Sequence, residues 1–169
     1  MRKTFFLTVV LAVGVSIITA CGTSGSFTIH HSSTEEVITQ GSVVDLIVTP
    51  PNSDGTSVAI QLRGQVAAQL LGAALFKSIA NPGGDADYKI TVKLTEIDDV
   101  SGVSRVLWGL FAGSNVIEGV VTILNNKTGQ MVRSFSFRAE SASHPNSGKA
   151  DISDAIARAT EEIIKGLEQ

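Results

Sequence analysis

The side chains that could bind a metal are few and scattered along the sequence. His30 and His31 are adjacent, and the third histidine, His144, lies far from them. Neighbouring side chains of an extended segment point to opposite sides, whereas zinc needs three or four converging ligands. Asp85 and Asp87 lack the additional oxygen ligands that calcium requires. We therefore expect no metal and no cofactor.

Motifs that would support catalysis are also missing. Asp98 and Asp99 are neighbours, so on an extended chain they cannot act as an acid–base pair on one face. Residues 22–26 place a serine beside glycines, but the last glycine of a nucleophile elbow and a preceding strand are missing. No glycine-rich phosphate-binding motif occurs. We expect no catalytic residues and no enzymatic activity.

Cys21 is the single cysteine, and its surroundings indicate lipid attachment. Arg2 and Lys3 form a basic start, and residues 5–20 carry no charge. About 16 such residues fit the core of a signal peptide better than a membrane span, which needs roughly 20. The sequence Ile-Thr-Ala-Cys-Gly at their end resembles a bacterial lipobox. This resemblance implies that Cys21 becomes the first mature residue and carries two or three acyl chains, enough for stable anchoring.

The organisation of the chain follows from this motif. We expect a signal peptide over residues 1–20, a lipidated Cys21 with a flexible tether over residues 21–40, and one periplasmic α+β domain over residues 41–169. The tether is rich in Ser, Thr and His, which bury little surface. Gly22 stands where Asp commonly favours inner-membrane retention in lipoproteins, so we expect the outer membrane. An ordinary signal peptide or an uncleaved anchor are the alternatives.

The composition limits the class of protein further. The chain has 169 residues, of which 43% are hydrophobic and 17% charged, which excludes a disordered chain and favours one compact domain. There are 13 basic and 16 acidic residues, and cleavage removes Arg2 and Lys3, so the mature charge is near −5. This acidic balance argues against binding to nucleic acid. A single cysteine excludes a disulfide framework.

Hydrophobic periodicity predicts the elements of the first half of the domain. The β-branched run 43–48 predicts a strand, and the four-residue spacing of apolar side chains over 58–79 predicts a helix. Gly64 and Gly72 each cost about 1 kcal/mol within a helix, and we expect close packing on a sheet to compensate. Alternation over residues 88–95 predicts a strand with one solvated face.

The second half predicts more strands and a final helix. Residues 103–111 and 114–124 are extended apolar runs, and the second forms a hairpin with 131–141 around the Asn- and Gly-containing turn 125–129. An amphipathic pattern over 152–167 predicts a helix. The order β-α-β-β-β-α predicts an α+β fold with two layers, in which two helices cover one face of a mixed or antiparallel sheet of four to five strands.

Several of these segments together resemble a bacterial lipoprotein family known as domain of unknown function 4410, over roughly residues 40–169. They are the strand before Pro50, Leu75-Phe76, the strand 88–95, Arg105 with Gly109 and Gly113, and the turn Asn126-Lys127-Thr128-Gly129. More distantly, the layout resembles the N-terminal domain of the Tol-system propeller protein and the periplasmic part of the curli secretion lipoprotein. Those relatives hold partners, and the family supplies no catalytic residues to transfer.

One apolar segment contains the single tryptophan, Trp108, and does not alternate. Most such runs belong to a core, and we expect Trp108 itself to be buried. The other interpretation is an exposed apolar edge or loop that contacts a partner or the membrane. The candidate partner surface comprises Arg105, Leu107, Leu110 and Phe111.

These observations favour a non-catalytic, lipid-anchored protein of the cell envelope. We expect it to dock onto or stabilise an envelope assembly, with the membrane bound through Cys21 and another envelope protein as its partner. The alternative is a carrier or sensor of a hydrophobic or glycan ligand held between the sheet and the helices.

Overall fold

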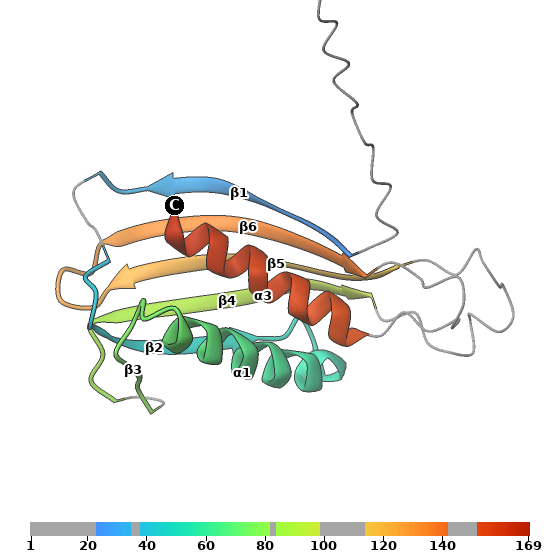
Figure 1. Cartoon of the computed structure of the whole chain (residues 1–169), viewed down its shortest axis with the longest axis horizontal. Helices are drawn as coiled ribbons and strands as arrows, with labels where there is room; N and C mark the ends of the chain where they lie inside the picture. Colours follow the sequence, from blue (N-terminus) through green and yellow to red (C-terminus); the bar gives the residue numbers. More distant parts are fainter. Residues whose placement is uncertain (1–22, 35–37, 82–83, 99–113, 142–151) are drawn as a thin grey trace, which may run out of the picture.

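The structure is a computed structural model that describes residues 23–34, 38–81, 84–98, 114–141 and 152–169 (Figure 1). These residues form a six-stranded sheet with two helices on one face. The elements in chain order are β1 (Ser24–Ser32), β2 (Val43–Thr49), a 3-10 turn (Ser53–Gly55), α1 (Thr56–Gly72), β3 (Ser78–Ile79), β4 (Tyr88–Asp98), β5 (Asn115–Asn125), β6 (Met131–Ser141) and α3 (Ile152–Glu168). The expected α+β class with two helices is confirmed.

The sheet is mixed, and its strand order is β1-β6-β5-β4-β2-β3. The strands β4, β5, β6 and β1 pair antiparallel, whereas β2 pairs parallel with both β4 and β3. Parallel pairing of β2 with β4 requires a long connection, and α1 supplies it by crossing the sheet between them. The expectation of four to five strands is only roughly matched, because β1 and the short β3 also belong to the sheet. The strand expected over residues 103–111 lies outside the described ranges.

The segment expected to be a flexible tether contains the strand β1, so Ser24–Ser32 are ordered as part of the sheet. β1 pairs antiparallel with β6, and Phe27 stands opposite Phe137. The Phe27 ring packs edge-on against Phe135, with 6.2 Å between the ring centroids. The sequence looks like a tether because β1 is an edge strand, where most residues are exposed and small polar side chains suffice.

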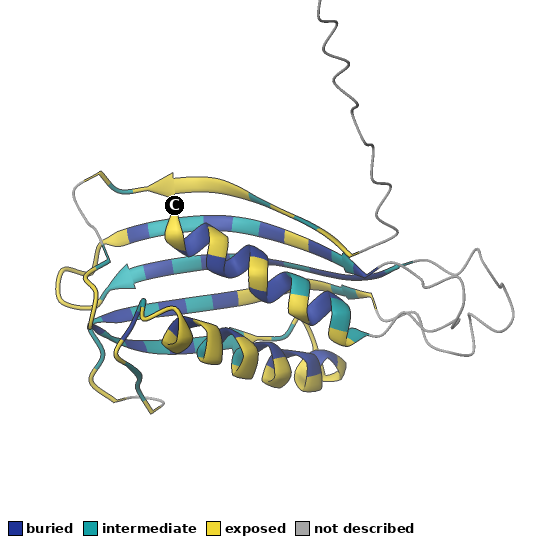
Figure 2. Ribbon diagram, viewed as in Figure 1, coloured by how far each residue is buried: buried dark blue, intermediate teal, exposed yellow. Residues whose placement is uncertain are grey.

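The hydrophobic core lies between the helices and the sheet (Figure 2). Alternate residues of β4, among them Tyr88, Ile90 and Val92, are buried towards the helices, while Lys93 is exposed on the other side. The solvated face expected for residues 88–95 is therefore confirmed. The hairpin of β5 and β6 was expected over 114–124 and 131–141 and agrees with the observed strands within one residue.

The helix α1 is shorter than the expected 58–79. The chain leaves the helix after Gly72, where Ala74 adopts a left-handed φ of 53°. Ser78 and Ile79 then pair with Val43 and Val44 as β3. The expectation that Gly64 and Gly72 allow close packing on the sheet is also wrong, because nothing beyond their own stretch of chain lies within 4 Å of a Cβ placed on either residue.

The helix α3 covers β6 and β1 and confirms the expected terminal helix. Its buried stripe includes Ala155, Ile156, Ala159 and Ile163. Neither α3 nor the other helix within the described ranges is long and apolar enough to cross a membrane.

Candidate functional site

The residues singled out in the sequence for lipidation and partner binding lie outside the described ranges. These are Cys21 and the candidate partner surface of Arg105, Leu107, Leu110 and Phe111, together with Trp108. His144 lies outside them too. The structure does show the positions of the described residues that flank these segments in the sequence.

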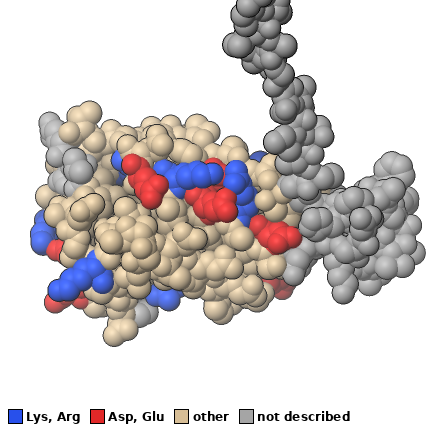
Figure 3. Space-filling model, viewed as in Figure 1, with Lys and Arg blue, Asp and Glu red and all other residues tan. Residues whose placement is uncertain are grey.

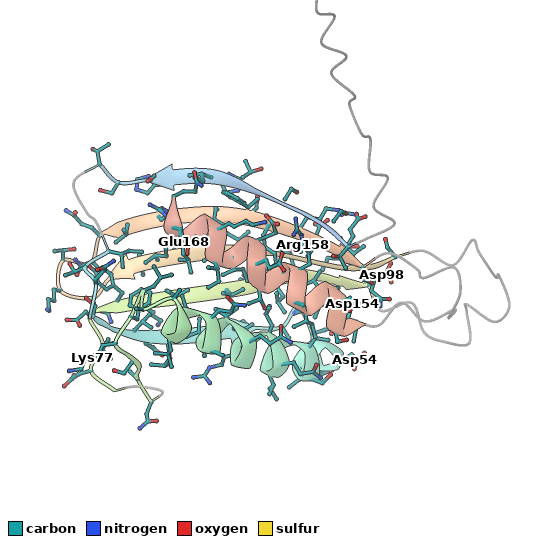
Figure 4. The ribbon with its side chains drawn as sticks, in the orientation of Figure 1. Asp54, Lys77, Asp98, Asp154, Arg158 and Glu168 are labelled. Atoms are coloured by element: carbon teal, nitrogen blue, oxygen red, sulfur yellow. The ribbon has the colours of Figure 1, made fainter. Side chains whose placement is uncertain are left out.

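One end of the sheet gathers the points at which the chain enters or leaves those segments. Ser24, the first residue of β1, stands opposite Glu140 near the end of β6. Asp98, the last residue of β4, stands opposite Val116 at the start of β5. Figure 4 shows Asp98 at this end together with Asp54 and Asp154. We call it the anchor end, because Ser24 follows Cys21 by only three residues.

His31 and Asp87 each have structural neighbours within the described ranges. His31 Nε2 lies 3.2 Å from the carbonyl oxygen of Met131. Asp87 accepts a hydrogen bond of 2.9 Å from the backbone N–H of Val43 and pairs with Lys127 Nζ at 2.7 Å. The hydrogen bond from Lys127 lowers the pKa of Asp87, and the Val43 N–H adds to this shift. Over the described ranges, no three His, Cys, Asp or Glu residues gather to hold a metal ion.

The other end of the domain contains a cavity of about 400 Å³, which we call the distal cavity. It lies where β1 and α3 both end, next to the segment that follows α1. Its walls combine apolar and polar side chains. The apolar ones are Ile38, Leu75, Phe76 and Leu167, and the polar ones are Ser32, Ser33, Gln40, Arg133, Glu168 and Gln169. Figure 4 shows Glu168 at this end of α3, opposite Asp154.

Among the described residues on the wall of the distal cavity, Arg133 is the one cation. Its Nη1 donates hydrogen bonds to the carbonyl oxygens of Gly166, at 3.0 Å, and Leu167, at 2.8 Å. These bonds fix the guanidinium against the last turn of α3, whose carbonyls carry partial negative charge. Arg133 Nε is buried without a hydrogen-bond partner, and burial lowers the pKa of the guanidinium.

Arg158, Lys165 and Arg138 differ from Arg133, because each of these cations pairs with a carboxylate. On α3, Glu162 is nearly fully buried and pairs with Arg158 Nη2 at 2.8 Å and with Lys165 Nζ at 3.0 Å. On the sheet face without helices, Arg138 pairs with Glu118 and Glu140. Figure 3 shows charged side chains in a band along α3, whereas the surface over α1 is mostly uncharged. Within the described part of the chain, Arg133 is thus a half-buried cation with no carboxylate partner.

Sequence reasoning did not single out Arg133. An arginine within an alternating strand is ordinarily a solvated residue, and its position at β6 conceals the contact with α3, 33 residues later. One signal was available: Arg133 occupies the same face as Phe135 and Phe137, since strand residues two apart share a face. A charge on an apolar face indicates a buried partner or a site.

The fold now defines the class of the protein: a two-layer α+β domain with a six-stranded mixed sheet and both described helices on one face. The family model described as Domain of unknown function (DUF4410) matches residues 47–167. The chain belongs to that family, as the sequence resemblance indicated. No curated protein matches the chain.

Two of the solved structures that resemble this chain show the same fold at low sequence identity. The chain is 14% identical to the protein of the PelC dodecamer from Paraburkholderia phytofirmans, with a TM-score of 0.60, covering 85% of this chain and 96% of that one. A variant of that dodecamer gives 13% identity and a TM-score of 0.58, with 83% and 95% covered. A DUF330 protein from Xanthomonas campestris is 12% identical over 75% of this chain and 80% of that one, with a TM-score of 0.46. The more distant likeness to the Tol and curli domains stays a prediction.

Proposed function

We propose that the protein is a non-catalytic, lipid-anchored subunit of the bacterial cell envelope. In this proposal, acyl chains on Cys21 hold it in the outer membrane, and the α+β domain faces the periplasm. The domain docks onto or stabilises an envelope assembly that contains another envelope protein.

The short distance along the chain between Cys21 and β1 carries this proposal. Ser24 begins β1 three residues after Cys21, and three extended residues span at most about 10 Å. A flexible tether of twenty residues would span roughly 25 Å. An anchored Cys21 therefore keeps the anchor end of the domain at the bilayer surface, where a membrane-bound partner is within reach.

Charge at the anchor end supports anchoring by acyl chains rather than by electrostatic attraction. The labelled residues Asp54, Asp98 and Asp154 lie at this end, and acidic side chains repel anionic lipid head groups (Figure 4). Membrane binding that depends on acyl chains resists salt, since salt screens only charge interactions.

An assembly of like subunits is one form that this docking can take. PelC, which shares the fold, is described as a dodecamer. This support is an analogy between folds and extends to no residue of the interface.

Metabolic labelling with a fatty acid tests the anchor. We expect the wild-type chain to incorporate the label and to stay in the membrane fraction after a high-salt wash. Cys21→Ser should lose the label. The double variant Cys21→Ser/Ser26→Cys is the matched control, because it keeps one thiol but places it outside the lipobox. Labelling of either variant would contradict the proposal. In a separate experiment, cross-linking of the wild-type protein in intact cells would identify its partner.

A second candidate function, carriage or sensing of a small ligand, is favoured by the distal cavity. Its volume of about 400 Å³ falls within the usual range of ligand pockets, about 300–1,000 Å³. Native mass spectrometry of the purified protein would test this function by detecting a bound small molecule.

A further inference from the structure

Arg133 on the wall of the distal cavity has no bonded carboxylate in the described part of the chain, although the exposed carboxylate of Glu168 lies on the same wall. Each of the paired cations Arg138, Arg158 and Lys127 has a carboxylate within its reach. Arg133 has only the two carbonyl oxygens at the end of α3, and its Nε has no partner. The partial charge at a helix C-terminus amounts to about half an elementary charge, so part of the positive charge remains.

The guanidinium of Arg133 is also fixed in position before any ligand arrives. Both printed hydrogen bonds use Nη1 alone. Nη2 has no bond to the described part of the chain and belongs to a residue that lines the cavity. A donor held in place in this way loses little conformational entropy when it binds an anion.

The remaining wall of the cavity selects for an apolar body. Leu75 and Ile38 are half-buried, and Phe76 and Leu167 are buried beside them. An apolar group that enters this space leaves water and covers these side chains, which is favourable in proportion to the area buried. A fully polar anion would bury none of this apolar surface and would contact only the polar part of the wall.

We propose that the distal cavity binds a small amphipathic anion, a molecule with one carboxylate or phosphate group and a short apolar body. The anionic group lies at Arg133, and the apolar body covers Ile38, Leu75 and Leu167. This inference rests on the second candidate function and names the class of ligand.

The position of the cavity indicates that the ligand is a free molecule. Ser32 and Ser33 line it at the end of β1, whereas β1 begins at the anchor end. A strand of nine residues extends roughly 30 Å. Head groups of the bilayer that holds Cys21 therefore lie at the opposite end of the domain.

Glu168 offers a test that spares the contacts of Arg133. Its side chain is exposed at the cavity and repels an anion, while the bonds of Arg133 to α3 use the carbonyls of Gly166 and Leu167. Glu168→Gln should tighten binding of an anion roughly fivefold, since two charges near a protein surface interact appreciably over several ångströms. Glu161→Gln, also an exposed position of α3 but outside the cavity, is the matched control.

The experiment measures binding of octanoate, octyl phosphate and 1-octanol to the mature lipoprotein in phosphatidylcholine nanodiscs, with empty nanodiscs as the blank. We expect both anions to bind at least tenfold more tightly than octanol. Arg133→Gln should remove this preference and keep a cooperative melting transition. Glu168→Gln should tighten octanoate, and Glu161→Gln should change nothing.

Each other outcome contradicts the inference in a distinguishable way. Equal binding of octanol and octanoate contradicts the proposed preference for an anion but remains consistent with a carrier function. Absence of binding by all three probes overturns the inference, and native mass spectrometry then decides separately whether the protein carries another small molecule. If the anion site is occupied only when the nanodiscs contain phosphatidylglycerol, the ligand is a lipid head group and not a free molecule. Lipidation of Cys21 is measured separately by acyl labelling, so its failure cannot be confused with these results.

Discussion

Gly166 of α3 lies directly against the ring of Phe135 of β6. A Cβ atom placed on Gly166 would lie 2.6 Å from Cζ and 2.8 Å from Cδ2 of Phe135, closer than real Cβ atoms approach other atoms. Phe135 is fully buried and also packs against Phe27 of β1. Because Phe135 is packed on both sides, its ring cannot easily move away from α3. The absence of a side chain at Gly166 therefore allows the short distance between the helix and the sheet.

Gly166→Ala should destabilise the domain despite the better helix propensity of alanine. Propensity alone favours alanine by about 1 kcal/mol, but overpacking a buried contact costs about 1–3 kcal/mol. We expect a net loss of up to about 2 kcal/mol in the free energy of unfolding, measured by urea denaturation. Unchanged or higher stability would show that α3 can shift on the sheet at little cost.

Gly64→Ala should change the free energy of unfolding in the opposite direction to Gly166→Ala. Gly64 lies in the interior of α1, and nothing lies within 4 Å of a Cβ built on it. The added methyl group meets no obstacle, so helix propensity decides and stability should rise by about 1 kcal/mol. The same urea measurement checks this. A loss of stability at Gly64 would mean that its outward surface is covered in the protein as purified.

The contact of Asp87 with Lys127 makes a pH-dependent contribution to stability. The pKa of Asp87 is lowered in the folded protein, chiefly by the hydrogen bond from Lys127. A carboxyl group of this kind stabilises the fold above its unfolded pKa, and the contribution disappears as the pH falls through the folded pKa. Both side chains are accessible to solvent, so we expect a small effect.

Asp87→Asn should therefore lower the melting temperature at pH 7 and reduce the further decrease seen on acidification. The asparagine oxygen still accepts the Val43 N–H, which isolates the charge pair from the backbone bond. Asp85→Asn, at an exposed position two residues earlier, is the control. Equal effects of the two variants would assign the pH dependence to net charge and not to the contact with Lys127.

The sequence predicts those parts of the fold in which local periodicity and burial agree. The alternation over residues 88–95, the hairpin signals over 114–141 and the amphipathic pattern over 152–167 each agree with the observed elements β4, β5–β6 and α3. The C-terminal end of α1 was placed too late because residues after Gly72 stay apolar. Periodicity alone does not reveal that Ser78 and Ile79 pair with β2.

The distal cavity escaped sequence analysis for a different physical reason. It lies between the ends of β1 and α3 and the segment after α1, which are distant in the sequence. No local spacing relates Arg133 to Gly166, because their contact depends on the packing of α3 across β6. Cys21, in contrast, has a signal that is wholly local, and it remains a prediction.

The strand β1 should be required for the stability of the domain, although the sequence places the domain boundary at residue 41. Removing residues before Gly41 deletes the partner of β6 along Ser24–Ser32 and uncovers Phe135 and Phe137, which are buried in the complete sheet. A chain that begins at Gly41 should therefore melt at a clearly lower temperature than one that begins at Thr23, or melt without a cooperative transition.

Phe27→Ala in the longer chain separates the contribution of side-chain packing from that of strand pairing. Phe27 is half-buried, so its loss should cost less than the 3–5 kcal/mol typical of a fully buried phenylalanine, about 1–3 kcal/mol. If the chain from Gly41 unfolds at the same urea concentration as the chain from Thr23, β1 adds nothing to the fold and the sequence boundary is right.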